Sequence, residues 1–209
     1  FSAAEVLIDE DDKVYGVATG DMGVSKDGIA KDSWESGMEL HAKYTLFSEG
    51  ARGSLSKFLI DNFELSKESD HQKYAIGIKE LWEVKEENHQ EGLVEHSMGW
   101  PLSEGTGGGS FLYHFGQNLV SIGYVVHLNY TNPYVSPFDE FQQFKTHPSI
   151  KKILEGGKRI SYGARAITAG GFQSVPKLFF PGGALIGCSA GFLNCLLYTS
   201  DAADESVGV

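Results

Sequence analysis

Four apolar stretches between residues 73 and 128 constrain the fold most, because short polar connections separate them and each has the length of a strand. They read KYAIGIKELWEV, GLVEHSMGW, SFLYHF and LVSIGYVVHL. In the first, Ile76 and Ile78 alternate with Ala75 and Gly77, as side chains on opposite faces of a strand do. The intervals are typical of an antiparallel sheet or meander. The middle of the chain is therefore predicted to be one antiparallel sheet.

The segment before this sheet predicts a hairpin and one helix. Two apolar runs, 6–8 and 14–18, lie on either side of acidic turn residues, which indicates a β-hairpin. Further on, MELHAKYTLF predicts a strand ending at Phe47, followed by a turn at 49–50 and a helix from about Ala51. The apolar positions that would form one face of this helix are Leu55, Phe58, Leu59 and Phe63.

The segment after the sheet predicts two short helices and a return to strands. Ser136 is a good N-cap, Pro137 suits the first helical position, and Phe138, Phe141 and Phe144 recur at helical spacing. Pro148 divides this region into two helices. Near the end of the chain, FFPGGALIGCSAGF predicts a strand at 184–186 that leads into a second glycine-rich turn and the start of a helix.

Composition excludes several classes of protein. The 209 residues carry a net charge of −11 with scattered Lys and Arg, which argues against a general nucleic-acid binder. There is no run of about eighteen apolar residues that would span a bilayer. Two cysteines cannot supply the four thiolates of an iron–sulfur cluster or a disulfide framework, which favours a reducing compartment. The first residues do not resemble a signal peptide, and the chain is expected to be an interior fragment.

The glycine run at 107–109 in GWPLSEGTGGGSFLYHF leaves two interpretations open. It fails as a dinucleotide fingerprint, because Ser110 stands at the third glycine position and a strand follows where a helix is needed. It can be a hairpin turn. Alternatively, Gly108 and Gly109 let a planar ligand lie against bare backbone and accept hydrogen bonds from their N–H groups, inside an apolar wall of Trp100, Pro101, Phe111 and Tyr113.

Other candidate sites are weaker. Seven dispersed histidines lack the spacing of metal ligands, so no metal site is predicted. The acidic residues Glu80, Glu83, Glu86 and Glu87 are interpreted as a solvated face or turn. No catalytic triad or acid–base pair is expected. The turn GCSAGF is interpreted either as a plain strand-to-helix connection or as a site for a pyrophosphate or a reduced flavin.

Several motifs together resemble the electron transfer flavoprotein–ubiquinone oxidoreductase family. They are YTLFSEGARGSLSK, GIKELWEV, GWPLSEGTGGGSFLYHF, NPYVSPFDEFQQFKTHP, LEGGKRISYGARAI and GGFQSVPKLFFPGGALIGCSAGF, in the family's order over residues 1 to about 194. The resemblance implies an α/β (α+β) fold: an FAD-binding fold of the glutathione-reductase-like superfamily with an inserted antiparallel quinone-binding sheet.

The resemblance also implies a function and a set of residues. Family members are peripheral membrane flavoenzymes with FAD and a [4Fe–4S] cluster, and they pass electrons from electron transfer flavoprotein to ubiquinone at the mitochondrial inner or bacterial cytoplasmic membrane. By this resemblance Gly108 and Gly109 contact the quinone. The residues implied near FAD are Gly50, Arg52, Gly53, Gly187, Ser189, Gly191 and Phe192.

The resemblance divides the chain and shows where it departs from the family. Residues 1–65 and 161–194 are expected to belong to the FAD-binding domain, and 66–160 to the quinone-binding insertion with helices near 137–155. The family's first G-x-G-x-x-G and its cluster cysteines are absent. Residues 195–209, CLLYTSDAADESVGV, are interpreted as non-native read-through of a sequencing adapter. Two alternatives are a related flavoprotein dehydrogenase feeding a quinone pool, of the nitrogen-fixation branch, and a non-catalytic β-rich module that binds an apolar ligand.

Overall fold

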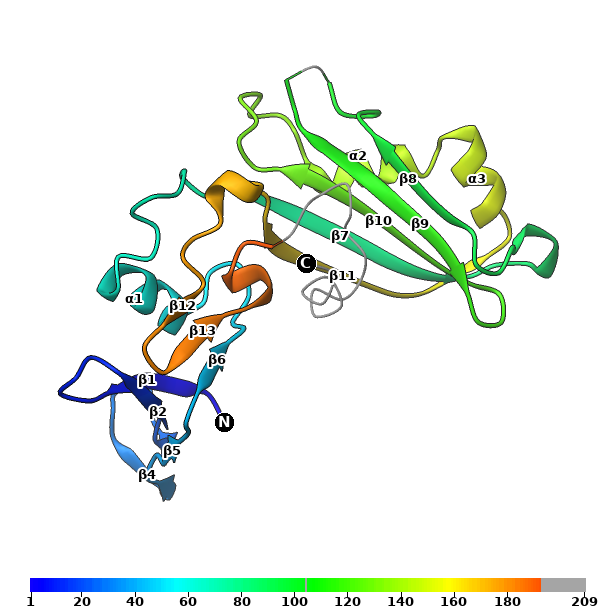
Figure 1. Cartoon of the computed structure of the whole chain (residues 1–209). Coiled ribbons are helices and arrows are strands. Elements are labelled where there is room, and N and C mark those ends of the chain that lie inside the picture. The colour runs from blue at the N-terminus through cyan, green and yellow to red at the C-terminus, as the bar shows by residue number, and fades with distance from the viewer. Residues whose placement is uncertain (104, 193–209) are drawn as a thin grey trace.

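The computed structural model describes residues 1–103 and 105–192, and the interpretation of 195–209 as a non-native tail lies outside these residues. The chain forms two parts (Figure 1). One contains several short strands and helix α1, and the other contains a large sheet with helices α2 and α3. The structure is thus mixed α/β with antiparallel sheets.

The smaller part begins with the predicted hairpin. Strand β1 (Ala3–Ile8) pairs antiparallel with β2 (Val14–Thr19), which confirms it, and β5 (Glu39–His41) pairs with the other edge of β2. A second hairpin, β3 (Met22–Val24) with β4 (Ala30–Glu35), was not predicted. All six residues of β4 are exposed, so this strand has no apolar alternation from which it could be recognised.

The predicted strand ending at Phe47 is in fact two short strands, β5 and β6 (Thr45–Phe47). Strand β6 pairs in parallel with β13 (Gly183–Leu185), and β12 (Phe179–Phe180) pairs with β13. Strand β13 begins at Gly183, one residue before the start predicted at residue 184. The parallel pair brings the turn after β6 beside the turn after β13, although the two are far apart in sequence.

Helix α1 (Ser54–Asn62) begins at Ser54 and not at Ala51, because its N-cap Gly53 has extended backbone with ψ 140°. Leu55 and Leu59 are buried as predicted, but Phe58 is 48% exposed, so the apolar face is narrower than the spacing suggests. Phe63 stacks on Phe180 with ring centroids 5.0 Å apart. These side chains join β1, β2, β6 and β13 in one core.

The larger part is the predicted antiparallel sheet, with strand order β11-β7-β10-β9-β8. Its strands are β7 (Tyr74–Glu83), β8 (Val94–Met98), β9 (Gly108–Phe115), β10 (Leu119–His127) and β11 (Lys158–Thr168). The predicted domain boundary at residue 160 falls inside β11. Short 3₁₀ turns are η1 (Glu86–Asn88), η2 (Phe172–Ser174) and η3 (Gly187–Ser189).

Both predicted helices cover one face of this sheet. They are α2 (Pro137–Phe144), capped by the Ser136 hydroxyl that accepts from the Asp139 N–H at 3.3 Å, and α3 (Pro148–Leu154). Phe141 and Phe144 are buried against Tyr124, while Phe138 is 58% exposed. We call the opposite side the open face. Since side chains alternate along β10, Val125 and His127 belong to the open face, and Tyr124 and Val126 to the helix side.

One of the four acidic residues interpreted as solvated is instead buried. Glu80 is only 2% exposed, and its carboxylate accepts hydrogen bonds from Lys145 at 2.9 and 3.0 Å, from Arg159 at 3.0 Å and from the Trp82 indole at 2.8 Å. Burial alone would raise the pKa of Glu80, but these hydrogen bonds outweigh it and lower the pKa. Glu80 therefore ties α2 and β11 to β7, whereas the other three carboxylates are exposed.

Candidate functional site

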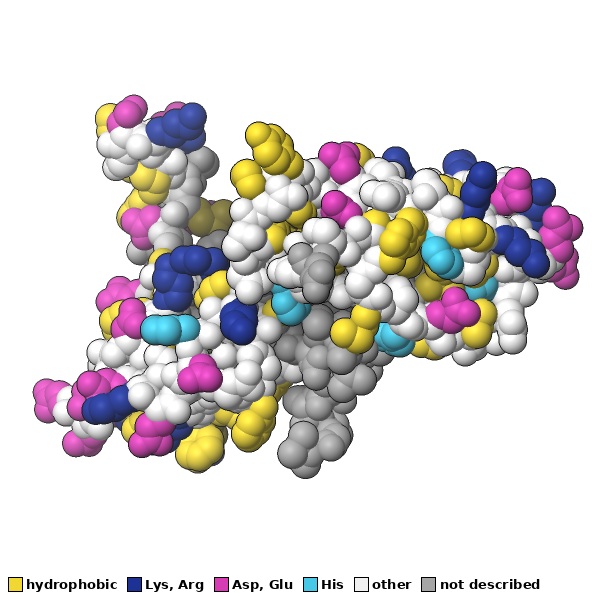
Figure 2. All heavy atoms as spheres, turned by 90° about the horizontal axis from the view of Figure 1, so that it is seen from above, with side chains coloured by type: hydrophobic (Ala, Val, Ile, Leu, Met, Phe, Trp, Pro, Cys, Tyr) yellow, Lys and Arg dark blue, Asp and Glu magenta, His cyan; other side chains and the backbone are white. Residues whose placement is uncertain are grey.

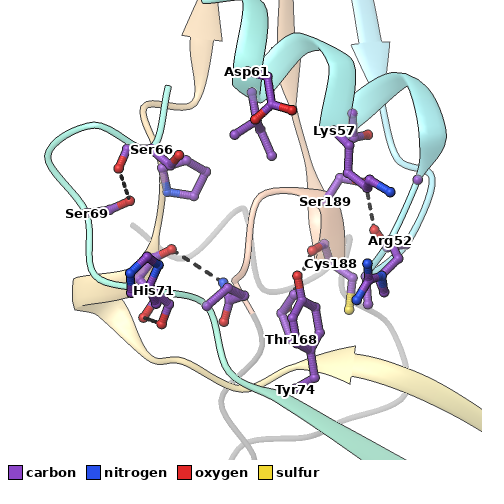
Figure 3. A pocket seen from close by; sticks show the side chains of 18 of the residues that line it. Arg52, Lys57, Asp61, Ser66, Ser69, His71, Tyr74, Thr168, Cys188 and Ser189 are labelled. Atoms are coloured by element: carbon purple, nitrogen blue, oxygen red, sulfur yellow. Dashed lines mark hydrogen bonds between the residues drawn. The ribbon is translucent and has the colours of Figure 1, made fainter. Parts of the chain in front are cut away.

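A cavity of about 380 Å³ lies where the turn after β6, helix α1 and the turn after β13 meet. Figure 3 shows Arg52, Tyr74 and Cys188 close together at one side of it, with His71, Ser66 and Ser69 at the other. The volume is within the range of small-molecule sites. Of the seven residues expected near FAD, Gly50, Arg52, Gly53 and Ser189 line this cavity.

The first turn is shaped by glycine and by one carboxylate. Gly50 has φ +83°, a conformation that side chains disfavour. Glu49 accepts hydrogen bonds from the Ser56 N–H at 2.6 Å and the Ser56 hydroxyl at 2.8 Å, and it lies so close to Gly53 that a Cβ there would collide with it. The N-terminus of α1 is thus already capped by Glu49, which leaves the backbone of the turn and the Arg52 side chain to face the cavity.

The second turn holds the remaining expected residues. The Ser189 hydroxyl donates to the Gly50 carbonyl oxygen at 3.0 Å and so ties the two turns together. Gly187, Gly191 and Phe192 belong to this turn but do not line the cavity: Gly191 approaches Gln72, and Phe192 packs on the core of the smaller part. The predicted helix start at Ser189 is a 3₁₀ turn as far as the described residues extend.

The charge around the cavity is mixed. Arg52 and Lys57 line it together with Asp61 and Asp70, and the Arg52 guanidinium lies 5.6 Å from the centroid of the Tyr74 ring. Two cationic side chains and the backbone of two turns can bind an anionic ligand, and Tyr74 with Ile60 adds apolar surface. These cationic, backbone and apolar groups together fit a nucleotide-like ligand that has an anionic portion and a planar ring.

The glycines expected to contact a quinone lie in strand β9 rather than in a turn. Gly109 is paired on both sides, with Val125 of β10 and Met98 of β8, and a Cβ on it would lie 2.7 Å from the Ser97 carbonyl oxygen. Gly108 pairs with Val126, and its carbonyl oxygen accepts from the Gly99 N–H at 3.4 Å. Because backbone N–H groups of a strand point toward the neighbouring strands, a ligand on a sheet face meets a glycine mainly through its bare Cα atom. Gly109, the partner of Val125, presents this atom to the open face, whereas Gly108, the partner of Val126, presents it to the helix side.

The expected apolar wall around these glycines is divided between two faces of the sheet, so that part of the prediction is wrong. Trp100 lies on the helix side, where its ring centroid is 5.2 Å from that of His147. Phe111 and Tyr113 alternate with Leu112, a residue of the helix-side core, and stack on each other on the open face at 5.8 Å. One-dimensional spacing cannot separate side chains that a strand sends to opposite faces.

A small apolar cluster connects the glycine segment to the cavity. Val125, the partner of Gly109, packs with Ala75 and Ile167, and Cys188 packs against this group. Cys188 also lines the cavity. The two regions are therefore next to each other across a few small side chains.

The sequence did not predict that three histidine side chains have a buried ring nitrogen that lacks a hydrogen bond. His89, His114 and His127 each have a buried Nε2 atom without a hydrogen-bond partner. Burial first, and then the charge of His89, lowers the pKa of His114, although Glu95 opposes this; burial and then Lys73 lower the pKa of His127. Across residues 1–103 and 105–192 no group of three or more His, Cys, Asp and Glu side chains is arranged to hold a metal.

The surface gives no sign of a dominant charge patch on the side that Figure 2 shows. There, the described Lys and Arg side chains are mixed with Asp and Glu at both ends, and hydrophobic and His side chains gather between them. Within the described ranges no helix is long and apolar enough to cross a membrane.

The fold is similar to that of several solved structures. The flavin-dependent halogenase CmlS matches with a TM-score of 0.59 over 99% of this chain and 34% of that chain, at 14% identity. The flavin-dependent brominase Bmp2 matches with a TM-score of 0.56 over 92% of this chain and 44% of that chain, also at 14% identity. The chain thus has the fold of part of a flavin-dependent enzyme.

Sequence comparison gives the family. Residues 74–167 match the family described as "ETF-QO, ubiquinone-binding". Electron transfer flavoprotein–ubiquinone oxidoreductase of Caenorhabditis elegans is 59% identical over 92% of this chain, the human protein 57% over 93%, and that of Pseudomonas aeruginosa 55% over 93%. The chain spans about a third of these relatives' length, 32%, 32% and 35% respectively. It belongs to the electron transfer flavoprotein–ubiquinone oxidoreductase family.

Proposed function

We propose that this chain is part of an enzyme that passes electrons from reduced electron transfer flavoprotein, through FAD, to ubiquinone. The observation that carries the proposal is the contact between Val125, the strand partner of Gly109, and the cluster that reaches Cys188 in the cavity. Electron transfer needs donor and acceptor close together, and this arrangement would separate them by a few small side chains.

The cavity residues fit FAD by their chemistry. Gly50 and Gly53 would offer backbone to the cofactor, Arg52 would bind its anionic portion, and Ser189 would hold the two turns in place. Gly187, Gly191 and Phe192 would shape the second turn from behind. FAD would supply the redox chemistry, and the protein would contribute orientation, apolar surroundings and electrostatics. The smaller part would then belong to an FAD-binding fold of the glutathione-reductase-like superfamily.

The large sheet would be the quinone-binding insertion, with Gly108 and Gly109 as its contact. A residue with a side chain at position 109 would press on the Ser97 carbonyl oxygen of β8, so glycine lets β8 and β9 lie close together at this buried position. The matched family region, 74–167, coincides with β7 to β11. The division of the chain at residues 65 and 160 is part of this proposal.

The proposed [4Fe–4S] cluster would take its ligands from outside this chain. The sequence contains two cysteines, and only Cys188 lies in the described residues, so the chain cannot supply four thiolates. No step in the account depends on the cluster. By analogy with its relatives, the enzyme would act at the surface of the mitochondrial inner membrane or the bacterial cytoplasmic membrane.

The test is the visible spectrum of a purified full-length enzyme that contains this chain. A flavin spectrum that bleaches on anaerobic reduction and returns when ubiquinone-1 is added supports the proposal. Protein that purifies without flavin, or reduced flavin that ubiquinone-1 fails to reoxidise, would contradict it and favour the apolar-ligand module.

A further inference from the structure

His127 is a polar side chain of the open face, two residues along β10 from Val125, the strand partner of Gly109. It ends strand β10, and its N–H donates to the Gly107 carbonyl oxygen at 2.9 Å. Since Gly107 has no side chain, the imidazole fills that space: a Cβ on Gly107 would lie 2.8 Å from Nδ1 and 3.4 Å from Cε1. Glycine at 107 and histidine at 127 thus fit each other directly beside Gly108.

The imidazole has an unused hydrogen-bonding atom. Nε2 of His127 is buried and has no partner, which is costly unless a ligand or water completes it. Burial and the positive charge of Lys73 lower the pKa of His127, so the ring is neutral near pH 7 and carries one N–H. A neutral imidazole with that proton on Nε2 is a hydrogen-bond donor.

A quinone at this position needs a donor that the glycines do not readily give. Gly109 is paired on both sides, which turns its N–H toward a neighbouring strand and away from the sheet face. Gly109 pairs with Val125, and His127 is the next residue of β10 on the same face, roughly 7 Å further along the strand. Ser121 also has an unpaired hydroxyl on this face, but it lies four residues before Val125 on β10, about 13 Å away along the strand.

We propose that His127 donates a hydrogen bond from Nε2 to a carbonyl oxygen of the quinone and so fixes the orientation of the quinone ring over Gly109. This inference rests on the proposed function. It assigns His127 a hydrogen-bonding role that the Gly109 N–H, which is turned toward a neighbouring strand, does not perform. A carbonyl oxygen that gains negative charge during reduction is stabilised by a donor aimed at it.

The experiment uses the full-length enzyme and ubiquinone-1 labelled with ¹³C at each carbonyl in turn. In the wild type, one carbonyl stretching band is expected at lower frequency than in free quinone, because a hydrogen bond weakens the C=O bond. His127→Leu should abolish this shift and raise the Kd for ubiquinone-1 about fivefold. His127→Gln, which keeps an N–H donor, should retain most of the shift and the affinity.

The control is His89→Leu, which removes another buried, unpaired Nε2 near His114, at the opposite end of the sheet. It should change neither the band nor the Kd. Flavin content and unfolding midpoint are measured for each variant. Unshifted bands for both carbonyls in the wild type, or a His127→Leu variant identical to it, would overturn the role of His127 while quinone binding persists. A wild type that binds no ubiquinone-1 would instead overturn the proposed function together with this inference.

Discussion

Ser189 donates a hydrogen bond of 3.0 Å to the carbonyl oxygen of Gly50, and this bond joins two turns whose bonded residues are 139 positions apart in the sequence. Parallel pairing of β6 with β13 brings the turns near each other, and the Ser189 hydroxyl fixes their separation. The cavity wall that they form together therefore depends on a contact between residues far apart in sequence.

Ser189→Ala is expected to loosen this wall. The variant loses one partly buried hydrogen bond, which costs about 1 kcal/mol of stability, and it should retain less flavin after dialysis. Denaturant unfolding and flavin absorbance of the full-length enzyme measure both effects. Ser36→Ala, which removes an exposed bond of Ser36 to the Gly37 carbonyl away from the cavity, is the matched control. Equal flavin retention in the two variants would refute a role for Ser189 in the site.

Glu80→Gln is expected to destabilise the large sheet. The neutral amide leaves Lys145, which is 13% exposed at its side chain, without its carboxylate partner, and breaking a buried ion pair costs about 3 kcal/mol. Urea unfolding measures the loss. Glu87→Gln is the control, because Glu87 is exposed and lies 3.8 Å from the Lys85 ammonium, so its loss should be close to zero. A similar small effect for both variants would contradict the structural importance of Glu80.

The same carboxylate predicts a pH dependence of stability. Since the pKa of Glu80 is lowered in the folded state, its contribution is fully present above its ordinary value of 4.5 and is lost as the pH falls through the lower folded value. Unfolding free energies measured at a series of pH values should therefore fall more steeply on the acidic side for the wild type than for Glu80→Gln. Parallel curves for the two proteins would show that Glu80 titrates normally.

Gly109→Ala is expected to raise the KM for ubiquinone-1 on the order of tenfold, because the new methyl group presses on the Ser97 carbonyl oxygen and shifts β8 against β9. Flavin content should not change, because Gly109 does not line the cavity. Gly163→Ala is the control: a Cβ there meets nothing within 4 Å, so the KM should stay the same. An unaltered KM in Gly109→Ala would remove Gly109 from the quinone site.

Much of the fold could be predicted from local patterns. The alternation around Ile76 and Ile78 predicted β7, and Ser136 with Pro137 predicted the start of α2, because both signals depend on neighbouring residues. Strand β4 had no such signal since all its residues are exposed. The burial of Glu80 was also unpredictable, because its partners Lys145 and Arg159 approach only when the sheet and α2 assemble.

Of the four glycines expected near FAD, Gly50 and Gly53 line the cavity, whereas Gly187 and Gly191 do not. Gly50 and Ser189 were identified through family resemblance, and the cavity includes both. The same reasoning expected one apolar wall from Trp100 to Tyr113, but the strand divides those side chains between two faces. His127 was treated as one of seven dispersed histidines. Its fit against Gly107 depends on the pairing of β9 with β10, which no spacing within either strand reveals.

The most direct test of the account is the place where a photoreactive azido-ubiquinone attaches to the full-length enzyme. The quinone is proposed to lie on the open face of the sheet, over Gly109 and beside the cluster that leads to Cys188. Peptide mapping should find the label between Gly107 and His127, and an excess of ubiquinone-1 should prevent it. A label confined to the helix side, around Trp100 and His147, would contradict the claim.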